Sequence, residues 1–164
     1  MIIDRVVVGP LKENCYIVTK NTKTIIIDPG DEADKIIDAT KDKNVVGILI
    51  THHHFDHVGA LKKLEDYFKI KESDFIPEIG MEVIKTPGHS RDSVCFYFKE
   101  DKVMFVGDFI FLNNIGRCDL PTGSDKEMLE SLAYIKKYPN DIVLYPGHGE
   151  PTNLEYEKNN FKYY

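Results

Sequence analysis

The sequence predicts an α/β or α+β domain in which helices cover sheets. The first observation is that short β-branched runs alternate along the chain with segments of helical periodicity. The second is that a chain of 164 residues has the length of one domain and contains no repeat, low-complexity tract or linker-like change in composition. We therefore expect a single layered domain over residues 1–164.

The expected strands are runs of Val, Ile, Phe and Tyr that end at turn residues. They lie at residues 6–8, 16–18, 24–27, 45–50, 83–84, 94–98, 103–106 and 142–145. About three helices are expected, at residues 33–37, 61–68 and 124–135. The third helix begins with the capping box Ser124-Asp125-Lys126-Glu127.

Composition narrows the function classes. The net charge of −6 and the pI near 5.5 argue against broad binding of nucleic acid or anionic membranes, which favour basic faces. No apolar stretch approaches the ~18 residues of a membrane span, and the N-terminus does not resemble a signal peptide. Lysines 62, 63, 69 and 71 are interpreted as a solvated surface. We expect a cytoplasmic protein with a small-molecule substrate, and a homo-oligomer is compatible with the sequence.

The three cysteines are an odd number without metal-like spacing. Cys15 and Cys95 lie in apolar runs and are expected to be buried hydrophobic side chains. Cys118 lies in a polar turn and is a candidate pocket residue. An odd number of cysteines, two of them expected to be buried, fits a reducing compartment.

All six histidines follow the ends of expected strands. His52, His53, His54 and His57 follow residues 45–50, together with Asp56. Loops at strand ends are where a rigid scaffold usually presents functional groups.

Three further strand ends carry similar side chains. His89 follows residues 83–84, Asp108 follows 103–106, and His148 follows 142–145. Each of these three residues alone would more often be a turn or surface residue. Burying the whole set without a metal would leave many polar atoms to satisfy, so we interpret the set as a metal site.

Imidazole and carboxylate groups are zinc ligands, and one zinc ion takes about four of them. Five histidines with Asp56 and Asp108 make seven candidates, which suits two ions that share a bridging carboxylate and a bridging water. His53 is left out, because alternate residues of an extended loop point in opposite directions.

These motifs resemble those of the metallo-β-lactamase superfamily. Residues 51–60, Thr-His-His-His-Phe-Asp-His-Val-Gly-Ala, look like its H-x-H-x-D-H signature. Its later motifs resemble Thr86-Pro87-Gly88-His89-Ser90, Val106-Gly107-Asp108 and residues 146–152, and its opening strands resemble Asn14-Cys15-Tyr16 and Ile27-Asp28-Pro29-Gly30. The resemblance implies a four-layer αββα sandwich with the metals at one edge.

Within the superfamily the chain is most similar to the glyoxalase II (hydroxyacylglutathione hydrolase) branch, on Gly116-Arg117-Cys118-Asp119-Leu120-Pro121. It resembles a short form without the C-terminal helical domain that helps to hold glutathione. The segment from Val58 to Pro87 is also shorter than is usual there, which implies a more open pocket.

The resemblance implies a ligand set for two divalent ions, zinc first, with iron or manganese as alternatives. His52, His54 and His89 would bind the first ion, Asp56, His57 and His148 the second, and Asp108 would bridge them. Asp56 and Asp108 would also be catalytic, because they fix the attacking hydroxide. Arg117 lies where the family often places a cationic contact to substrate, although a plain surface arginine needs no explanation.

The expected reaction is hydrolysis of a small thioester such as S-lactoylglutathione. Alternatives remain open at this stage. A persulfide dioxygenase with one iron resembles this branch at the same histidines, although residues 146–151 are more similar to the motif of the hydrolases. Two further hypotheses are less similar to this branch. One is a hydrolase of another ester, lactone, lactam or phosphodiester, and the other is a non-enzymatic metal-binding module.

Overall fold

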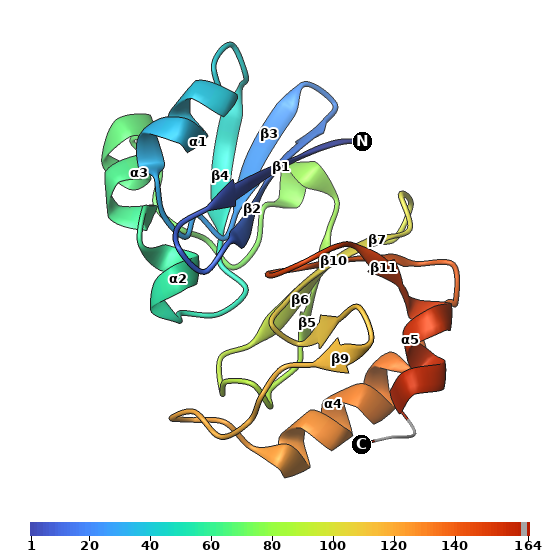
Figure 1. Ribbon diagram of the computed structural model, residues 1–164. Helices are drawn as coiled ribbons and strands as arrows, with labels where there is room; N and C mark the ends of the chain where they lie inside the picture. The colour runs from blue at the N-terminus through green and yellow to red at the C-terminus, as the bar shows by residue number, and fades with distance from the viewer. Residues whose placement is uncertain (162–163) are drawn as a thin grey trace. The chain divides into compact units, whose positions relative to one another are not determined.

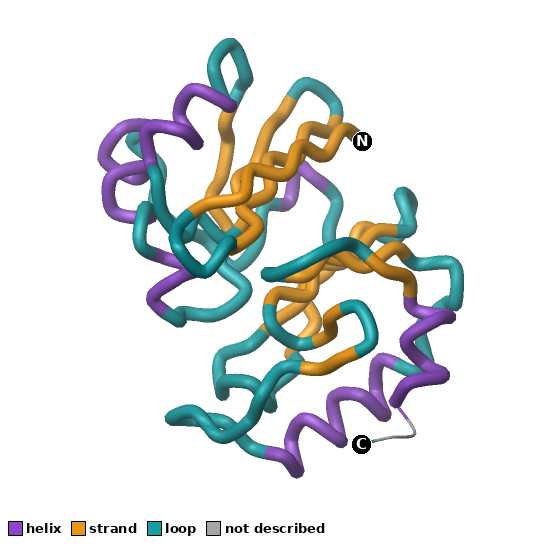
Figure 2. The backbone as a smooth tube through the Cα atoms, in the orientation of Figure 1, coloured by secondary structure: helices purple, strands orange, loops and turns teal. Residues whose placement is uncertain are grey.

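The structure is a computed structural model that describes residues 1–161 and 164. The chain divides into two compact units, an N-terminal unit, Met1–Met81, and a C-terminal unit, Glu82–Tyr164. Each unit has its own sheet and its own helices (Figures 1 and 2). The expectation of a single domain over residues 1–164 stays a prediction.

The N-terminal unit is built on a four-stranded sheet with the order β1-β2-β3-β4. Its strands are β1 (Ile2–Val8), β2 (Glu13–Lys20), β3 (Lys23–Ile27) and β4 (Val45–Leu49). The first three strands pair antiparallel, and β4 joins β3 in parallel. Its helices are α1 (Ala33–Ala39), α2 (Phe55–Val58), α3 (Leu61–Phe68) and the 3-10 turn η1 (Pro77–Ile79).

The core of this unit joins the sheet to α1 and α3, which lie side by side (Figure 1). Ile26 and Ile48 from the sheet belong to one buried cluster with Ile36 of α1 and Leu64 of α3. The β-branched run of β3 favours a pleated strand, and the i, i+3 spacing of Leu61 and Leu64 gives α3 one apolar face.

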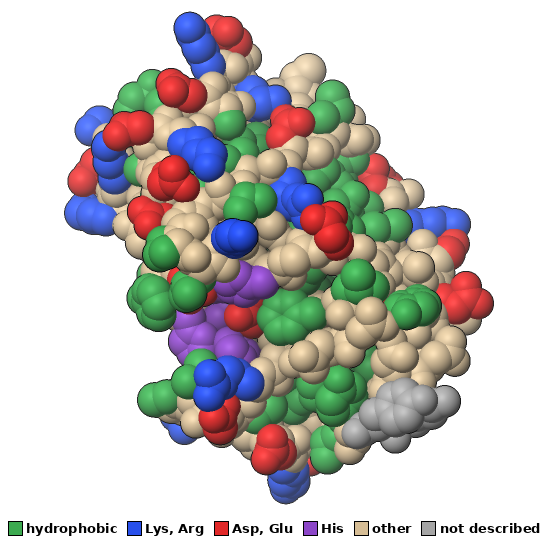
Figure 3. Space-filling view, viewed as in Figure 1, with side chains coloured by type: hydrophobic (Ala, Val, Ile, Leu, Met, Phe, Trp, Pro, Cys, Tyr) green, Lys and Arg blue, Asp and Glu red, His purple; other side chains and the backbone are tan. Residues whose placement is uncertain are grey.

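The outer surface of the helices is charged, as expected for the lysines there. Lys62 contacts Asp66 at 3.0 Å, Lys63 contacts Asp34 at 2.7 Å and Lys71 contacts Glu65 at 2.7 Å. Figure 3 shows Lys, Arg, Asp and Glu side chains interspersed over the part of the surface that α1 and α3 occupy in Figure 1. Mixed charge of this kind solvates a helix face rather than forming a basic binding patch.

The C-terminal unit is built on a five-stranded sheet with the order β11-β10-β7-β6-β5. Its strands are β5 (Glu82–Lys85), β6 (Val94–Phe98), β7 (Val103–Gly107), β10 (Val143–Pro146) and β11 (Thr152–Asn153). A separate hairpin consists of β8 (Ile110–Phe111) and β9 (Asn114–Ile115). The helices are α4 (Asp125–Ile135) and α5 (Leu154–Asn160).

Strand direction brings three loops to one edge of this sheet. β7 pairs with β10 in parallel, and β6 pairs antiparallel with both β5 and β7. β5, β7 and β10 therefore run in the same direction, and the loops after them begin at the same edge.

Helix α4 begins as the sequence predicts. Ser124 is its N-cap, and its Oγ accepts a hydrogen bond from the Glu127 amide at 3.2 Å. Met128 and Leu132 then pack against Cys95 and Leu144 of the sheet in one buried cluster. The burial of Cys95, and of Cys15 in the other unit, confirms that these two cysteines are core side chains.

Helix α5 is held to its surroundings by a buried carboxylate. Glu157 is 1% exposed and accepts hydrogen bonds from the Thr152 hydroxyl at 2.6 Å, the Asn160 amide at 3.0 Å and the Asn113 backbone N–H at 3.2 Å. Asn113 lies between β8 and β9, so Glu157 ties the hairpin to α5. Neither the β8–β9 hairpin nor α5 is among the elements predicted from the sequence.

No helix in the described part of the chain has the length and apolar character needed to cross a membrane.

Candidate metal centre

The histidines of the N-terminal unit gather after β4, as the sequence predicts. The ring centroids of His52 and His54 lie 4.6 Å apart, and those of His52 and His57 lie 4.1 Å apart. His52 and His57 are buried, and His54 is half-buried. Three imidazoles packed this closely form a concentrated set of nitrogen donors.

The backbone of this segment differs from the expected loop. His54 is an extended N-cap, and Phe55–Val58 forms a helical turn that carries Asp56 and His57. The side chain of His53 is 54% exposed and its Nε2 lies 3.4 Å from Glu72, in agreement with the expectation that it points away from the other histidines.

One buried carboxylate organises this half of the centre. Asp28 Oδ1 accepts a hydrogen bond from the Thr51 amide at 2.7 Å. Its Oδ2 accepts from the Thr51 hydroxyl at 2.6 Å and lies 3.0 Å from His57 Nδ1. From the sequence, Asp28 was predicted only as part of a turn.

These contacts determine which ring nitrogen carries the proton in the neutral form of two imidazoles. A carboxylate oxygen only accepts, so His57 Nδ1 carries the proton and donates it to Asp28. The Thr51 hydroxyl already donates to Asp28, so its oxygen accepts from His52 Nδ1 at 3.1 Å. In the neutral form of both rings Nε2 is therefore the nitrogen with the electron pair, and this is the form that binds a metal.

A tight approach between two backbone segments makes this arrangement possible. A Cβ on Gly30 would lie 1.8 Å from the Asp56 carbonyl oxygen, and one on Gly59 would lie 2.3 Å from the Gly30 carbonyl oxygen. Only glycine at both positions lets the turn after Asp28 rest directly on α2. The sequence Asp28-Pro29-Gly30 thus places the organising carboxylate and α2 together.

The C-terminal unit carries the second half of the predicted ligand set. His89, Asp108 and His148 follow β5, β7 and β10. Asp108 Oδ2 lies 3.6 Å from His89 Nε2 and 3.7 Å from His148 Nε2. One carboxylate oxygen between two imidazole nitrogens is the arrangement that a bridging ligand requires.

His89 is held by the segment that contains Arg117. Its Nδ1 lies 2.7 Å from the Arg117 carbonyl oxygen, so Nδ1 is the donor, and its Nε2 lies 3.6 Å from Asp108 Oδ2. The role predicted for Arg117 concerns its side chain, and a backbone contact of this kind leaves no signal in residue identity.

The Arg117 guanidinium makes a bidentate pair with Asp119. Both nitrogen–oxygen distances are 2.6 Å, and both side chains are exposed. This pairing lowers the pKa of Asp119 to about 2. A substrate anion at Arg117 would therefore share the guanidinium with Asp119 or displace it.

The donor set fits divalent metal ions. It consists of imidazole nitrogens and carboxylate oxygens, and three of its histidines have Nδ1 engaged by a carboxylate, a hydroxyl or a carbonyl. Metal-binding histidines characteristically donate their second ring N–H in this way. The two halves of the set belong to the two units.

The chain belongs to the metallo-beta-lactamase superfamily, whose family model matches residues 8–73 and 69–148. The two matched stretches meet inside the segment from Val58 to Pro87, which the sequence analysis found short for the family.

Relatives of known name lie at about 30% identity. A hydroxyacylglutathione hydrolase (GloC) of Haemophilus influenzae is 31% identical, with 96% of this chain and 95% of that protein covered. A probable metallo-hydrolase (YqgX) of Bacillus subtilis is 30% identical, with 96% and 95% covered. A protein of Aquifex aeolicus is 33% identical over an alignment of 199 positions, which exceeds the 164 residues of this chain, so that the relative contains insertions.

Solved structures show the same fold. The protein TTHA1623 in a di-iron-bound form matches with a TM-score of 0.87 at 30% identity, over 94% of this chain and 96% of that chain. The B3 metallo-beta-lactamase BLEG-1 also matches with a TM-score of 0.87, at 27% identity, over 96% and 97%. These matches confirm the α/β metallo-β-lactamase sandwich as the fold class.

Proposed function

We propose that the chain is a binuclear metallohydrolase that hydrolyses small acyl-thiol substrates such as S-lactoylglutathione. The observation that carries this proposal is the position of Asp108 Oδ2 between His89 Nε2 and His148 Nε2, at 3.6 and 3.7 Å. Carboxylate oxygens in such positions bridge two ions, whereas a single ion would need fewer donors than this chain offers. The named hydroxyacylglutathione hydrolases among the relatives support the substrate class.

The proposed ligand set is the one that the family resemblance implies. His52, His54 and His89 would hold one ion, Asp56, His57 and His148 would hold the other, and Asp108 would be shared by both. Zinc is the metal expected first, and iron is a serious alternative because a similar structure is di-iron-bound. Two ions in this set would supply a hydroxide nucleophile at neutral pH and stabilise the oxyanion of the attacked carbonyl.

The residues of the chain contribute orientation. Asp28 holds His57 directly and His52 through Thr51, while the Arg117 carbonyl holds His89, so three imidazoles are fixed before substrate arrives. The carboxylates of Asp56 and Asp108 accept hydrogen bonds from the attacking water and aim it at the thioester carbonyl. The leaving thiol has a pKa near ~8.5 and departs as thiolate, so the reaction needs no strong general acid.

The test combines metal analysis with two assays. We expect about two metal ions per chain and loss of S-lactoylglutathione without oxygen uptake. One iron per chain with oxygen uptake on glutathione persulfide would instead establish a dioxygenase.

The similarity to BLEG-1 favours β-lactam hydrolysis as a second candidate function. The chromogenic cephalosporin nitrocefin tests it on the same preparation. Turnover of nitrocefin with no loss of any thioester would replace the first proposal.

A further inference from the structure

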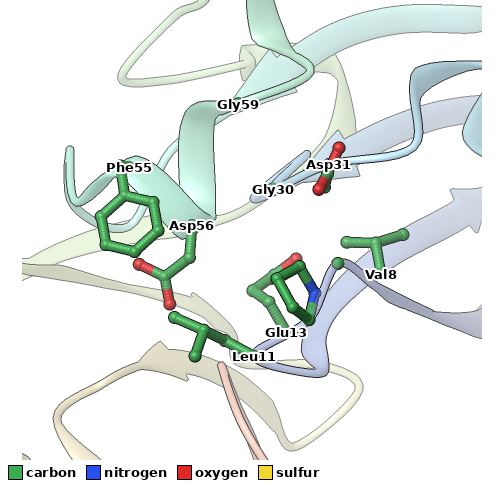
Figure 4. A pocket seen from close by; sticks show the side chains of 10 residues that line it. Val8, Leu11, Glu13, Gly30, Asp31, Phe55, Asp56 and Gly59 are labelled. Carbon is green, nitrogen blue, oxygen red and sulfur yellow. The ribbon is translucent and has the colours of Figure 1, made fainter.

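A pocket in the N-terminal unit lies beside the proposed metal ligands. It has a volume of about 210 Å³ and is bounded by the turn between β1 and β2, by the turn after β3 and by α2 (Figure 4). Asp56, a proposed ligand, forms part of its wall. A ligand in the pocket would therefore contact Asp56.

The wall of the pocket combines apolar groups with carboxylates. In the view of Figure 4, Phe55 and Asp56 lie at one end, Asp31 and Val8 lie at the other, and Glu13 lies between them. Phe55 is 74% exposed, which is unusual for a phenylalanine and presents its ring to a ligand. None of the ten lining residues, all in the described part of the chain, is Lys, Arg or His.

The charge of the pocket does not depend on Asp56 alone. If Asp56 binds a metal ion, its charge is offset there, and the exposed carboxylate of Asp31 remains. Glu13 is 1% exposed and its Oε1 lies 3.9 Å from His57 Nδ1, whereas Asp31 is exposed and accepts a hydrogen bond from the Glu32 amide at 2.6 Å. Lys35, the lysine of α1, donates a hydrogen bond to the Val7 carbonyl oxygen at 2.7 Å.

We infer that this pocket receives the thiol half of the substrate and selects thiols that carry an ammonium group over thiols that carry a carboxylate. An exposed aromatic ring beside carboxylates attracts alkylammonium groups, through the ring face and through opposite charge. A volume near 210 Å³ suits a head group of this size and lies below the range usual for larger ligands. This inference rests on the proposed function and narrows its substrate class: it ranks thioesters of cationic thiols above S-lactoylglutathione, whose thiol half carries two carboxylates and one ammonium group.

A matched series of thioesters tests the selection. Acetylthiocholine, S-acetyl-N-acetylcysteamine and S-acetyl-3-mercaptopropionate share the acetyl group and a two-carbon spacer, and their thiol halves carry charges of about +1, 0 and −1 at neutral pH. We expect kcat/KM to fall in that order, by about tenfold from the first to the last. An equal or reversed order would overturn the inference.

Variants assign the selection to the pocket. Asp31→Asn keeps the oxygen that accepts a hydrogen bond from the Glu32 amide and removes the negative charge. The ratio of kcat/KM for the cationic substrate to kcat/KM for the anionic substrate should therefore decrease about threefold. Asp38→Asn is the matched control, because Asp38 is an exposed aspartate of α1 that does not line the pocket. An equal narrowing in both variants would mean that only net charge matters and would refute the pocket's role.

Binding without turnover separates this inference from the proposed function. We expect choline to shift the backbone amide resonances of residues 8–13 and 55–59 in the zinc-loaded chain, and its uncharged isostere 3,3-dimethylbutan-1-ol to shift them several-fold less at equal concentration. Phe55→Ala should weaken the choline shifts. If choline binds in this way and no thioester is hydrolysed, the preference of the pocket for ammonium groups is supported and the proposed function is wrong. If thioesters are hydrolysed and choline leaves these resonances unchanged, the inference is wrong.

Discussion

Asp28 Oδ2 lies 3.0 Å from Nδ1 of His57, a residue 29 positions further along the chain. The same carboxylate receives both the amide and the hydroxyl of Thr51, the residue before His52. Asp28 therefore fixes two imidazoles although it belongs to no expected ligand set. The contribution of Asp28 to metal binding can be measured without a substrate.

We predict that Asp28→Asn weakens metal binding by about 10–100-fold. The amide offers one acceptor oxygen and an NH₂ group that opposes another donor, so Thr51 and His57 cannot both keep their contacts. Competition with a coloured chelator measures the affinity. Asp38→Asn, on the exposed face of α1, should leave it unchanged. Unaltered affinity in Asp28→Asn would show that the ligands are fixed without this carboxylate.

Removal of the proposed bridge should affect both ions. We predict that Asp108→Ala lowers metal content and turnover together, with a loss of turnover of about 100-fold or more. Metal analysis of the purified variant, alongside the thioester assay, measures both. Retention of two ions per chain would refute the bridging role of Asp108. Asp119→Ala, an exposed aspartate of the same unit, is the control for metal content.

The buried carboxylate of Glu157 in α5 is expected to stabilise the folded protein. Glu157→Ala should lower the free energy of unfolding by about 3 kcal/mol, because it leaves the Thr152 hydroxyl and the Asn113 N–H without their charged acceptor. Thermal denaturation should show a decrease in Tm of about 10 °C. Glu155→Ala removes an exposed carboxylate from the same helix and should change Tm by little. Equal effects of the two variants would contradict this account.

The three thiols should differ in reactivity. Burial raises the pKa of Cys95 to about 12 and raises that of Cys15, so both stay protonated and hidden from reagents. Cys118 is partly exposed and lines a pocket, and burial also raises its pKa. A raised pKa lowers the thiolate fraction at a given pH, so its reaction with a disulfide reagent should be slow near pH 8 and accelerate up to and beyond pH 9. Native protein should release one equivalent of colour, and Cys118→Ser none.

The sequence predicted most of the fold because strands such as Val94–Phe98 are long enough for their composition to be distinctive. It missed α2, a helix of four residues, because one turn is too short to show periodicity. It also missed α5, although Asn153 caps that helix by accepting from the Tyr156 amide at 2.9 Å, a signal that the sequence contained.

The candidate ligands were predictable for a different reason. Histidine and aspartate at strand ends are visible in the sequence, but the groups that hold them are not. The role of Asp28 was missed because its partners are distant in sequence, and the contact of His89 with Arg117 was missed because it uses a carbonyl oxygen that every residue has. Such contacts become visible only when strand pairing is known.

The parallel pairing of β7 with β10 determines when this half-site can form during synthesis. Asp108 and His148 become neighbours only after the connection through α4 has crossed back to the sheet, and such long-range pairing is slow to form. A nascent chain that has not yet released β10 therefore has Asp108 without its His148 neighbour. Any metal uptake that needs both side chains would therefore follow the pairing of β10 with β7, and the folding rate of the C-terminal unit, measured by stopped-flow fluorescence, would set an upper limit on its rate.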